Sequence, residues 1–330
     1  MIVEKAYCKI REEKMKKVMI LQSKILDFIR EFFRSKGIIE IVAPIIGPAT
    51  DPGIRGAKKV SFDYYGTTYY IMSSAILYKQ AFATAFANDS VKGIWIFSPN
   101  IRLEPIETAK TGRHLTEFVQ IDVELPYASY EDAMKVCEDL FYHVCKRVSE
   151  ECSKELEFFK RELKVSKPPY KKITHWEAVE ILRKKGFDAS FSEEIPWEGE
   201  KELSKMFDSP FFIIDYPKGS RGFYDKEDEK RTNKEGRKIL RDFDMIYPEG
   251  YGEAASGAER EYEIEKVLAR MKENGEDPEK YKWYMEMLKD GIVPSAGFGI
   301  GLERLTRFIC GLESIAYARP FAKLAGIVSP

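Results

Sequence analysis

Apolar and polar residues alternate over residues 118–125, and this period of two predicts a β-strand with two unlike faces. The apolar residues of the strand are expected to face a core. The other face combines an aromatic ring and an amide with two carboxylates, whereas a solvated face would carry variable charge. Its members are Phe118, Gln120, Asp122 and Glu124.

The segment before this strand points to nucleotide chemistry. Residues 101–104 alternate in the same way, and the charged, turn-rich residues 105–113 are predicted to form a long hairpin loop between the two strands. Arg113 and His114 lie close to Phe118 in the sequence. A guanidinium binds phosphate oxygens bidentately and an aromatic ring stacks on a base, so this group suits a nucleoside polyphosphate. An amphipathic hairpin with one solvated face explains the same pattern, and both interpretations stay open here.

Helical segments and short β-rich runs are mixed along the whole chain. The spacing of apolar residues predicts helices over 18–33, 75–88 and 129–151, among others. We therefore expect one α+β domain over residues 1–330, with an antiparallel sheet flanked by helices and an N-terminal helical extension at 1–17. The β-rich runs lie at 38–46, 60–72, 94–97, 211–216, 243–247 and 293–299.

The composition excludes several classes of protein. Lys and Arg (53) balance Asp and Glu (54), so no basic excess indicates nucleic acid as the main partner. Five cysteines without a CxxC pair argue against a disulfide framework or a zinc knuckle, and three histidines argue against a histidine-based metal cluster. Because the sequence has no signal peptide and no apolar run long enough to span a membrane, we expect a cytoplasmic protein.

A glycine-rich stretch, Gly297–Arg304, joins a predicted strand to a predicted helix. Glycines let the backbone approach a ligand, and the free N–H groups of a helix N-terminus attract an anion. Arg304 adds a fixed positive charge in the first turn. A dinucleotide fingerprint is the rival interpretation, but it requires a βαβ unit that this sequence does not predict. Glycine packing without a ligand is the third interpretation.

Oxygen ligands for a metal ion are grouped near a second glycine-rich turn. Glu253 and Ser256 follow that turn, and Asp244 lies on the strand before it. Carboxylates and a hydroxyl are the hard ligands that Mg²⁺ uses while it shares phosphate oxygens, although a solvated acidic loop has the same composition. Lys79 is a charged residue within an apolar helix, where it either serves a site or extends its amine to solvent.

Together these segments resemble the catalytic core of class II aminoacyl-tRNA synthetases, specifically the aspartyl/asparaginyl subgroup. Three stretches stand in the order of the family's signature motifs: Gly37–Pro44, Arg102–Glu104 with Arg113–Phe118, and Gly299–Arg304. The resemblance runs from about residue 20 to the C-terminus. It implies the class II catalytic fold, with an antiparallel sheet flanked by helices, and a homodimer formed through the first stretch.

The resemblance also implies roles for individual residues. Arg102 and Arg304 would be catalytic, with Arg102 on the α-phosphate and the substrate carboxylate and Arg304 on the γ-phosphate. The residues implied to bind ATP are Arg102, Glu104, Arg113, His114, Leu115, Phe118, Glu253, Gly301 and Arg304. Those implied to bind the amino acid are Asp51, Ser74, Lys79, Arg102, Gln120, Ser256 and Arg260. Those implied to hold Mg²⁺ are Asp244, Glu253 and Ser256.

Two departures from the family pattern decide the expected reaction. The anticodon-binding barrel that precedes the core in these synthetases is not expected here, so tRNA is not expected as a partner. Lys79 follows the aspartyl pattern, and with Arg260 it would present two cations that only an aspartate side chain balances. Ile76 and Asp51 differ from the aspartyl family, which has glutamine and glutamate there.

We therefore expect an archaeal-type asparagine synthetase related to asparaginyl-tRNA synthetase. Aspartate and ATP would form an aspartyl-adenylate, and ammonia from solvent would attack it to give asparagine, AMP and pyrophosphate. The alternatives are a ligase that loads an activated amino acid onto tRNA or another carrier, and a non-catalytic synthetase paralogue that acts as a binding or regulatory subunit.

Overall fold

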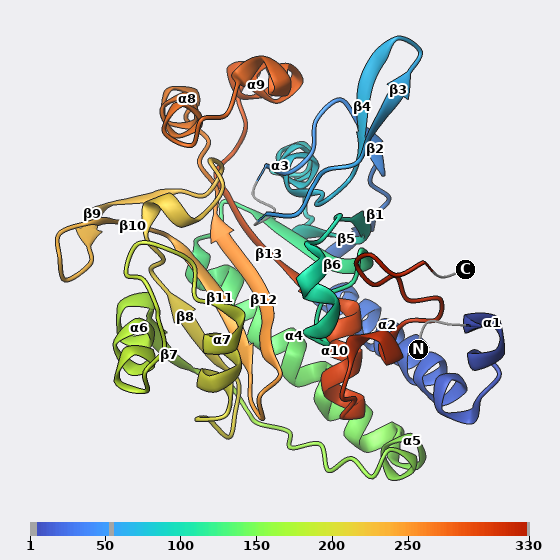
Figure 1. The fold of residues 1–330 in the computed structure, drawn as a ribbon. Helices are drawn as coiled ribbons and strands as arrows, with labels where there is room; N and C mark the ends of the chain where they lie inside the picture. Colours follow the sequence, from blue (N-terminus) through green and yellow to red (C-terminus); the bar gives the residue numbers. More distant parts are fainter. Residues whose placement is uncertain (1–4, 53–55, 329–330) are drawn as a thin grey trace.

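The computed structural model describes residues 5–52 and 56–328. An eight-stranded sheet runs through the molecule in the order β1-β5-β6-β13-β12-β11-β8-β7 (Figure 1). Its pairs are antiparallel except at the two edges, where β1 pairs with β5 and β7 with β8 in parallel. The strands are β1 (Ile38–Ile41), β5 (Gly93–Ile101), β6 (Glu117–Pro126), β7 (Lys171–Thr174), β8 (Phe211–Ile214), β11 (Asp242–Tyr247), β12 (Gly252–Glu259) and β13 (Ser295–Gly301).

Long helices cover one face of this sheet. Helices α2 and α4 lie side by side along it, and α10 packs against β6 and β13 (Figure 1). The large core between the helices and the sheet includes the apolar side chains of β6 at 119, 121, 123 and 125, so the predicted faces of this strand are confirmed. The helices are α1 (Ala6–Lys9), α2 (Glu13–Ser35), α3 (Ile76–Ala85), α4 (Tyr130–Glu151), α5 (Ser153–Phe158), α6 (His175–Lys184), α7 (Trp197–Ser204), α8 (Ile264–Glu273), α9 (Lys282–Asp290) and α10 (Leu302–Cys310).

Smaller elements surround the other face. A three-stranded sheet of β2 (Ile46–Gly47), β3 (Ser61–Tyr64) and β4 (Thr67–Ile71) projects from one side, and α8 and α9 form a lobe beside it (Figure 1). Strands β9 (Glu227–Thr232) and β10 (Lys238–Leu240) make a separate hairpin. The charged hairpin loop predicted before β6 is present, with a short 3₁₀ turn at Ile106–Lys110.

Two predictions about chain organisation have different outcomes. The α+β fold with a mainly antiparallel sheet flanked by helices is confirmed. The N-terminal extension contains a short separate helix, α1, before α2 begins at Glu13, and its residues 1–4 lie outside the described part of the chain. That the chain forms one domain stays a prediction. None of the helices in the described residues is both long and apolar enough to cross a membrane.

Candidate active site

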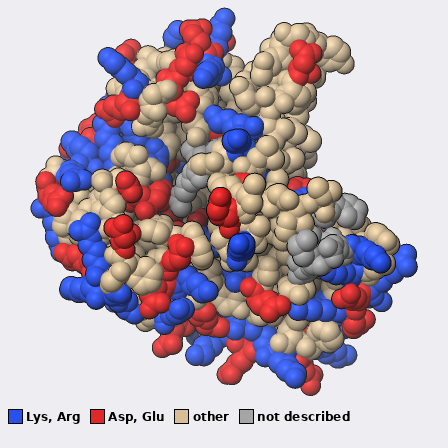
Figure 2. Space-filling model, in the orientation of Figure 1, with Lys and Arg blue, Asp and Glu red and all other residues tan. Residues whose placement is uncertain are grey.

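A cavity of about 660 Å³ opens on the face of the sheet opposite the long helices. Side chains of both charges surround the hollow at the centre of this face (Figure 2). Of the residues predicted to form the site, only Asp244 does not line this cavity. The residues that the structure brings together are Asp51, Ser74, Lys79, Arg102, Glu104, Arg113, His114, Leu115, Phe118, Gln120, Glu253, Ser256, Arg260, Gly301 and Arg304.

Strand β13 leaves space at the floor of the cavity because its residues there are glycines. Its even-numbered residues pack in the core, so its glycines face the site. A Cβ on Gly297 would lie 2.1 Å from both a Glu124 oxygen and the Val123 carbonyl oxygen, and one on Gly299 would lie 2.8 Å from Asp122. These glycines therefore make room for the charged side chains of β6 as well as for a ligand.

A β-bulge places Glu253 and Ser256 on the same side of β12. Residues three apart in a regular strand face opposite sides of the sheet. Here the pairing with β11 shifts between Glu253 and Ala255, so that Ala254 is the extra residue. Ala254 and Ala255 both pack in the core, and the two polar side chains line the cavity.

Two arginines and two glutamates form a chain of ion pairs at one end of the cavity. Arg113 Nη2 lies 2.7 Å from Glu200 Oε2 and 3.6 Å from Glu253 Oε2. Arg304 Nη1 lies 3.1 Å from the other oxygen of Glu253. These ion pairs hold the two guanidiniums in place at the end of the cavity to which the ATP contacts are assigned. Glu200 on α7 was missed by the sequence analysis, because nothing in an acidic helix turn indicates a distant arginine partner.

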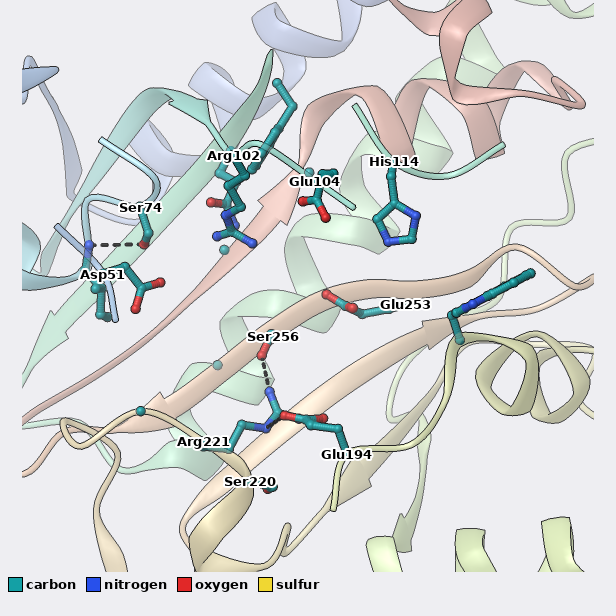
Figure 3. A pocket seen from close by; sticks show the side chains of 18 of the residues that line it. Asp51, Ser74, Arg102, Glu104, His114, Glu194, Ser220, Arg221, Glu253 and Ser256 are labelled. Carbon is teal, nitrogen blue, oxygen red and sulfur yellow. Dashed lines mark hydrogen bonds and ion pairs between the residues drawn. The ribbon is translucent and has the colours of Figure 1, made fainter. Parts of the chain in front are cut away.

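Arg102 lies on the wall opposite Glu253 and Ser256, together with Glu104 and His114 (Figure 3). Its Nε donates to the Ser73 carbonyl oxygen at 2.9 Å, and its guanidinium lies 5.1 Å from the centre of the Phe118 ring. Burial raises the pKa of Glu104, and the nearby guanidiniums of Arg102 and Arg304 oppose this shift. Arg102 and Phe118, both implied by the resemblance to bind ATP, thus lie side by side.

Buried side chains of both charges lie at the other end of the cavity. Lys79 Nζ lies 3.4 Å from Asp122 and 3.5 Å from Glu124. Arg260 lies 3.1 Å from Glu124 and 3.0 Å from Asp225. Burial raises the pKa of Asp225, although Arg260 opposes the shift. The expectation that these two cations need a substrate carboxylate is therefore wrong, because three protein carboxylates already balance them.

Asp244 is fully buried beneath the cavity and bonds to Arg221, which the sequence analysis did not select. The local sequence around Arg221 does not indicate its role, because its partners lie on β11 and β12, far away in the sequence. Tyr224 in the same segment donates to Asp51 at 2.7 Å. These bonds connect the Arg221 segment to β11 and to Asp51 in one wall of the cavity.

Glu253 and Ser256 fit a magnesium ion better than Asp244 does. Both offer hard oxygens and line the cavity, whereas Asp244 is fully buried and does not line it. Within the described residues, no three His, Cys, Asp or Glu side chains are placed to hold a metal ion by themselves. Mg²⁺ commonly takes one or two protein ligands and completes its shell with water and phosphate oxygens, so this donor set suits a nucleotide-bound ion.

Residues 1–325 match the model of the family described as tRNA synthetases class II (D, K and N). The chain belongs to this class II synthetase family. The asparagine–tRNA ligase of Pyrococcus abyssi is 34% identical over 333 residues, which span all of this chain and 73% of that protein. The aspartate–tRNA(Asp/Asn) ligase of Methanopyrus kandleri is 35% identical over 310 residues, 93% of this chain and 67% of that protein.

Solved structures of class II synthetases agree with this assignment. The asparaginyl-tRNA synthetase of Pyrococcus horikoshii, in complex with asparaginyl-adenylate, superposes with a TM-score of 0.90 at 33% identity, over all of this chain and 73% of that one. The class II catalytic fold and membership of an ATP-using ligase family are thus confirmed.

The expected reaction and acceptor are corrected by the same findings. The relatives are named tRNA ligases over the full length of this chain, which contradicts ammonia-dependent asparagine synthesis and the exclusion of tRNA. The exclusion rested on the expected absence of the anticodon-binding barrel, and that barrel does not determine which nucleophile reaches an adenylate. The choice of aspartate rested on an unbalanced positive charge that the structure does not have.

Proposed function

We propose that this chain is an ATP-dependent ligase that activates asparagine or aspartate as an aminoacyl-adenylate and transfers the aminoacyl group to tRNA. One observation carries the proposal: Arg102, Arg304, Phe118 and the charged Lys79–Arg260 end all line a single cavity. The family assignment and the relatives' names support the choice of acceptor.

In the first step the α-carboxylate of the amino acid attacks the α-phosphorus of ATP. A C–O–P bond forms, the bond to the β-phosphate breaks, and pyrophosphate leaves. Arg102 is assigned to the α-phosphate and Arg113 and Arg304 to the leaving phosphates, where fixed cations stabilise charge as it develops. Glu253 and Ser256 would hold Mg²⁺, which when bound neutralises phosphate charge.

In the second step a ribose hydroxyl at the 3′ end of tRNA attacks the acyl carbonyl carbon. The ester bond forms, the C–O bond of the mixed anhydride breaks, and AMP leaves with the electron pair while the hydroxyl proton passes to a phosphate oxygen. The polar walls of the cavity keep the adenylate oriented and limit attack by water, so that the tRNA hydroxyl reacts with an adenylate that is already formed.

The charge of the amino-acid end favours an uncharged side chain. Two cations face three carboxylates there, so a further carboxylate meets more repulsion than an amide does. An amide also offers a donor to Asp225 and an acceptor to Arg260. Asparagine is therefore the first substrate to test, with aspartate as the direct comparison.

Pyrophosphate exchange into ATP tests the first step. We expect exchange with asparagine, with a slower rate or none for aspartate, and then formation of aminoacyl-tRNA from labelled amino acid. Exchange with aspartate alone would overturn the charge argument while leaving the enzyme class intact. Absence of exchange with both amino acids, in a chain that unfolds cooperatively, would overturn the proposed function.

A further inference from the structure

Arg221 stands where several elements of the cavity wall meet. Its Nη1 donates to Ser256 Oγ at 2.8 Å, a bond drawn in Figure 3. Nη1 and Nη2 also donate to the two oxygens of Asp244 at 3.2 and 2.7 Å. Its Nε lies 2.8 Å from Glu194 Oε1, and Asp242 lies 3.6 Å away. One side chain thus joins β11, β12 and two loops.

The two loops lead to opposite ends of the cavity. The loop that carries Arg221 continues to Tyr224 and Asp225, which bond to Asp51 and Arg260 at the amino-acid end. The loop of Glu194 continues into α7, where Glu200 holds Arg113 at the end assigned to ATP. Between them lies Ser256, which is assigned to the metal ion.

The environment of Arg221 suits a fixed guanidinium and no other side chain. Its side chain is 9% exposed, and its guanidinium carbon lies 4.0 Å from the centre of the Tyr216 ring. Burial works to lower the pKa of Arg221, but the carboxylates of Asp244, Glu194 and Asp242 outweigh it and hold the pKa well above its ordinary value. A lysine keeps the charge but has no planar fork that can hold Asp244 and Ser256 together.

We propose that Arg221 is a positioning residue that couples the binding of the amino acid to the binding of ATP through Ser256 and the two loops. This inference rests on the proposed function. When ATP and its metal ion bind at Ser256, they restrict the motion of that side chain. Because Ser256 is bonded to Arg221, the loop that carries Tyr224 and Asp225 is restricted as well. Each substrate then meets a wall that the other has already ordered, so the two bind with positive cooperativity.

The outer side of the loop is held independently of Arg221. Arg270 on α8 donates to the carbonyl oxygens of Lys218, Gly222 and Asp225 at 3.0, 3.2 and 3.1 Å. Replacement of Arg221 therefore leaves the loop attached to the molecule and changes mainly its inner contacts. We therefore expect Arg221→Lys to fold.

The test measures cooperativity directly in the full chain. Calorimetry gives the Kd of asparagine, or of aspartate if that is the substrate, with and without Mg²⁺ and a non-hydrolysable ATP analogue. In the unmodified chain we expect the analogue to tighten amino-acid binding at least tenfold. In Arg221→Lys we expect this factor to fall below threefold, while the Kd of each ligand alone changes less than threefold.

Arg231→Lys is the matched control. Arg231 also binds an aspartate bidentately, Asp215 at 2.9 and 3.0 Å, and bonds through Nε to a second carboxylate, but it does not line the cavity. We expect this variant to keep the full cooperativity. If Arg221→Lys does not fold, Ser256→Ala removes the hydroxyl that bridges to Arg221 and is also assigned to Mg²⁺, so loss of cooperativity supports the inference there only if the Kd of the ATP analogue alone changes less than threefold.

Several outcomes would overturn the inference. They are unchanged cooperativity in Arg221→Lys or Ser256→Ala, equal loss in Arg231→Lys, and no cooperativity in the unmodified chain. If Arg221 had a merely structural role, Arg221→Lys would weaken the binding of each ligand alone. The factor by which the ATP analogue tightens amino-acid binding would then stay unchanged. Pyrophosphate exchange by the unmodified chain separates the two proposals, because its absence defeats the proposed function, whereas exchange with intact cooperativity in Arg221→Lys defeats only this inference.

Discussion

At the scale of single residues, the arginines of the site are kept in place by ion pairs with glutamates. Arg304 and Arg113 share Glu253, and Arg113 also holds Glu200. A guanidinium that is already fixed loses less entropy when a phosphate replaces or joins its partner. The cost is competition, since the phosphate must be bound next to carboxylates.

Replacement of Arg304 by alanine tests its assigned role. We expect kcat/KM for pyrophosphate exchange to fall about a hundredfold or more, the usual effect of removing one preorganised group that stabilises transition-state charge. Glu253 keeps Arg113 as a partner, so folding should survive. Arg307→Ala, one turn further along α10 and bonded to the Glu313 carbonyl oxygen, is the control and should lose less than about fivefold. Equal losses in both variants would contradict the assignment.

His175 gives the clearest pH dependence of stability. It is 2% exposed, its Nε2 lies 2.8 Å from the Glu193 carbonyl oxygen, and burial lowers its pKa to about 4. Between the ordinary value near 6.5 and this value, the unfolded chain binds a proton that the folded chain does not. Its contribution to stability is therefore complete above pH 6.5 and is lost as the pH falls toward 4.

The corresponding measurement is urea unfolding at pH 7 and pH 5. We expect His175 to account for about 2 kcal/mol of the decrease in unfolding free energy between these values. His175→Gln does not titrate in this range, so its decrease should be smaller by that amount. The same decrease in both proteins would show that the ring is accessible to protons in the folded chain.

At the scale of elements, alternation predicted β6 correctly because the period of two is a property of the strand itself. The same rule fails for β12, where the shared face of Glu253 and Ser256 depends on a bulge, and the bulge depends on the register with β11. The carboxylate partners of Lys79 and Arg260 were likewise hidden, since they come from β6 and from the loop before β9. The local sequence could identify Lys79 and Arg260 as charged groups, but it could not show which carboxylates pair with them.

The glycines of β13 allow a test of this element. Gly297→Ala would place a Cβ 2.1 Å from the carbonyl oxygen of Val123, which belongs to the paired strand and cannot move cheaply. We expect a loss of about 3 kcal/mol in unfolding free energy, together with loss of exchange activity. In Gly301→Ala the nearest atoms lie 3.6 Å away in the flexible Arg304 side chain, so the loss should stay below about 1 kcal/mol. Similar losses in the two variants would argue against a crowded floor.

At the scale of the whole molecule, the sheet brings distant segments to one cavity. Strand β6, the bulged β12 and the glycine strand β13 form the floor, while the walls include loops at residues 51–52, 102–115, 194–197 and 219–225. The three signature motifs resembled those of the class II family, and this resemblance predicted both the fold and the grouping of these segments. The acceptor did not follow, because the chemistry that forms an adenylate is the same whichever nucleophile later attacks it.

The concentration of acidic groups in the cavity predicts how ATP stabilises the whole chain. Triphosphate bound at Arg113 and Arg304 lies beside Glu253 and Glu200, and without a cation this repulsion cancels part of the attraction. We therefore expect ATP with Mg²⁺ to raise the thermal unfolding midpoint by several degrees, as ligands that bind only the folded state do, and ATP with EDTA to raise it by less than half as much. In Glu253→Gln one negative charge and a hard ligand are removed, so the two conditions should give more similar midpoints. If ATP stabilises the unmodified chain equally with and without the metal ion, then Glu253 and Ser256 are not a magnesium site.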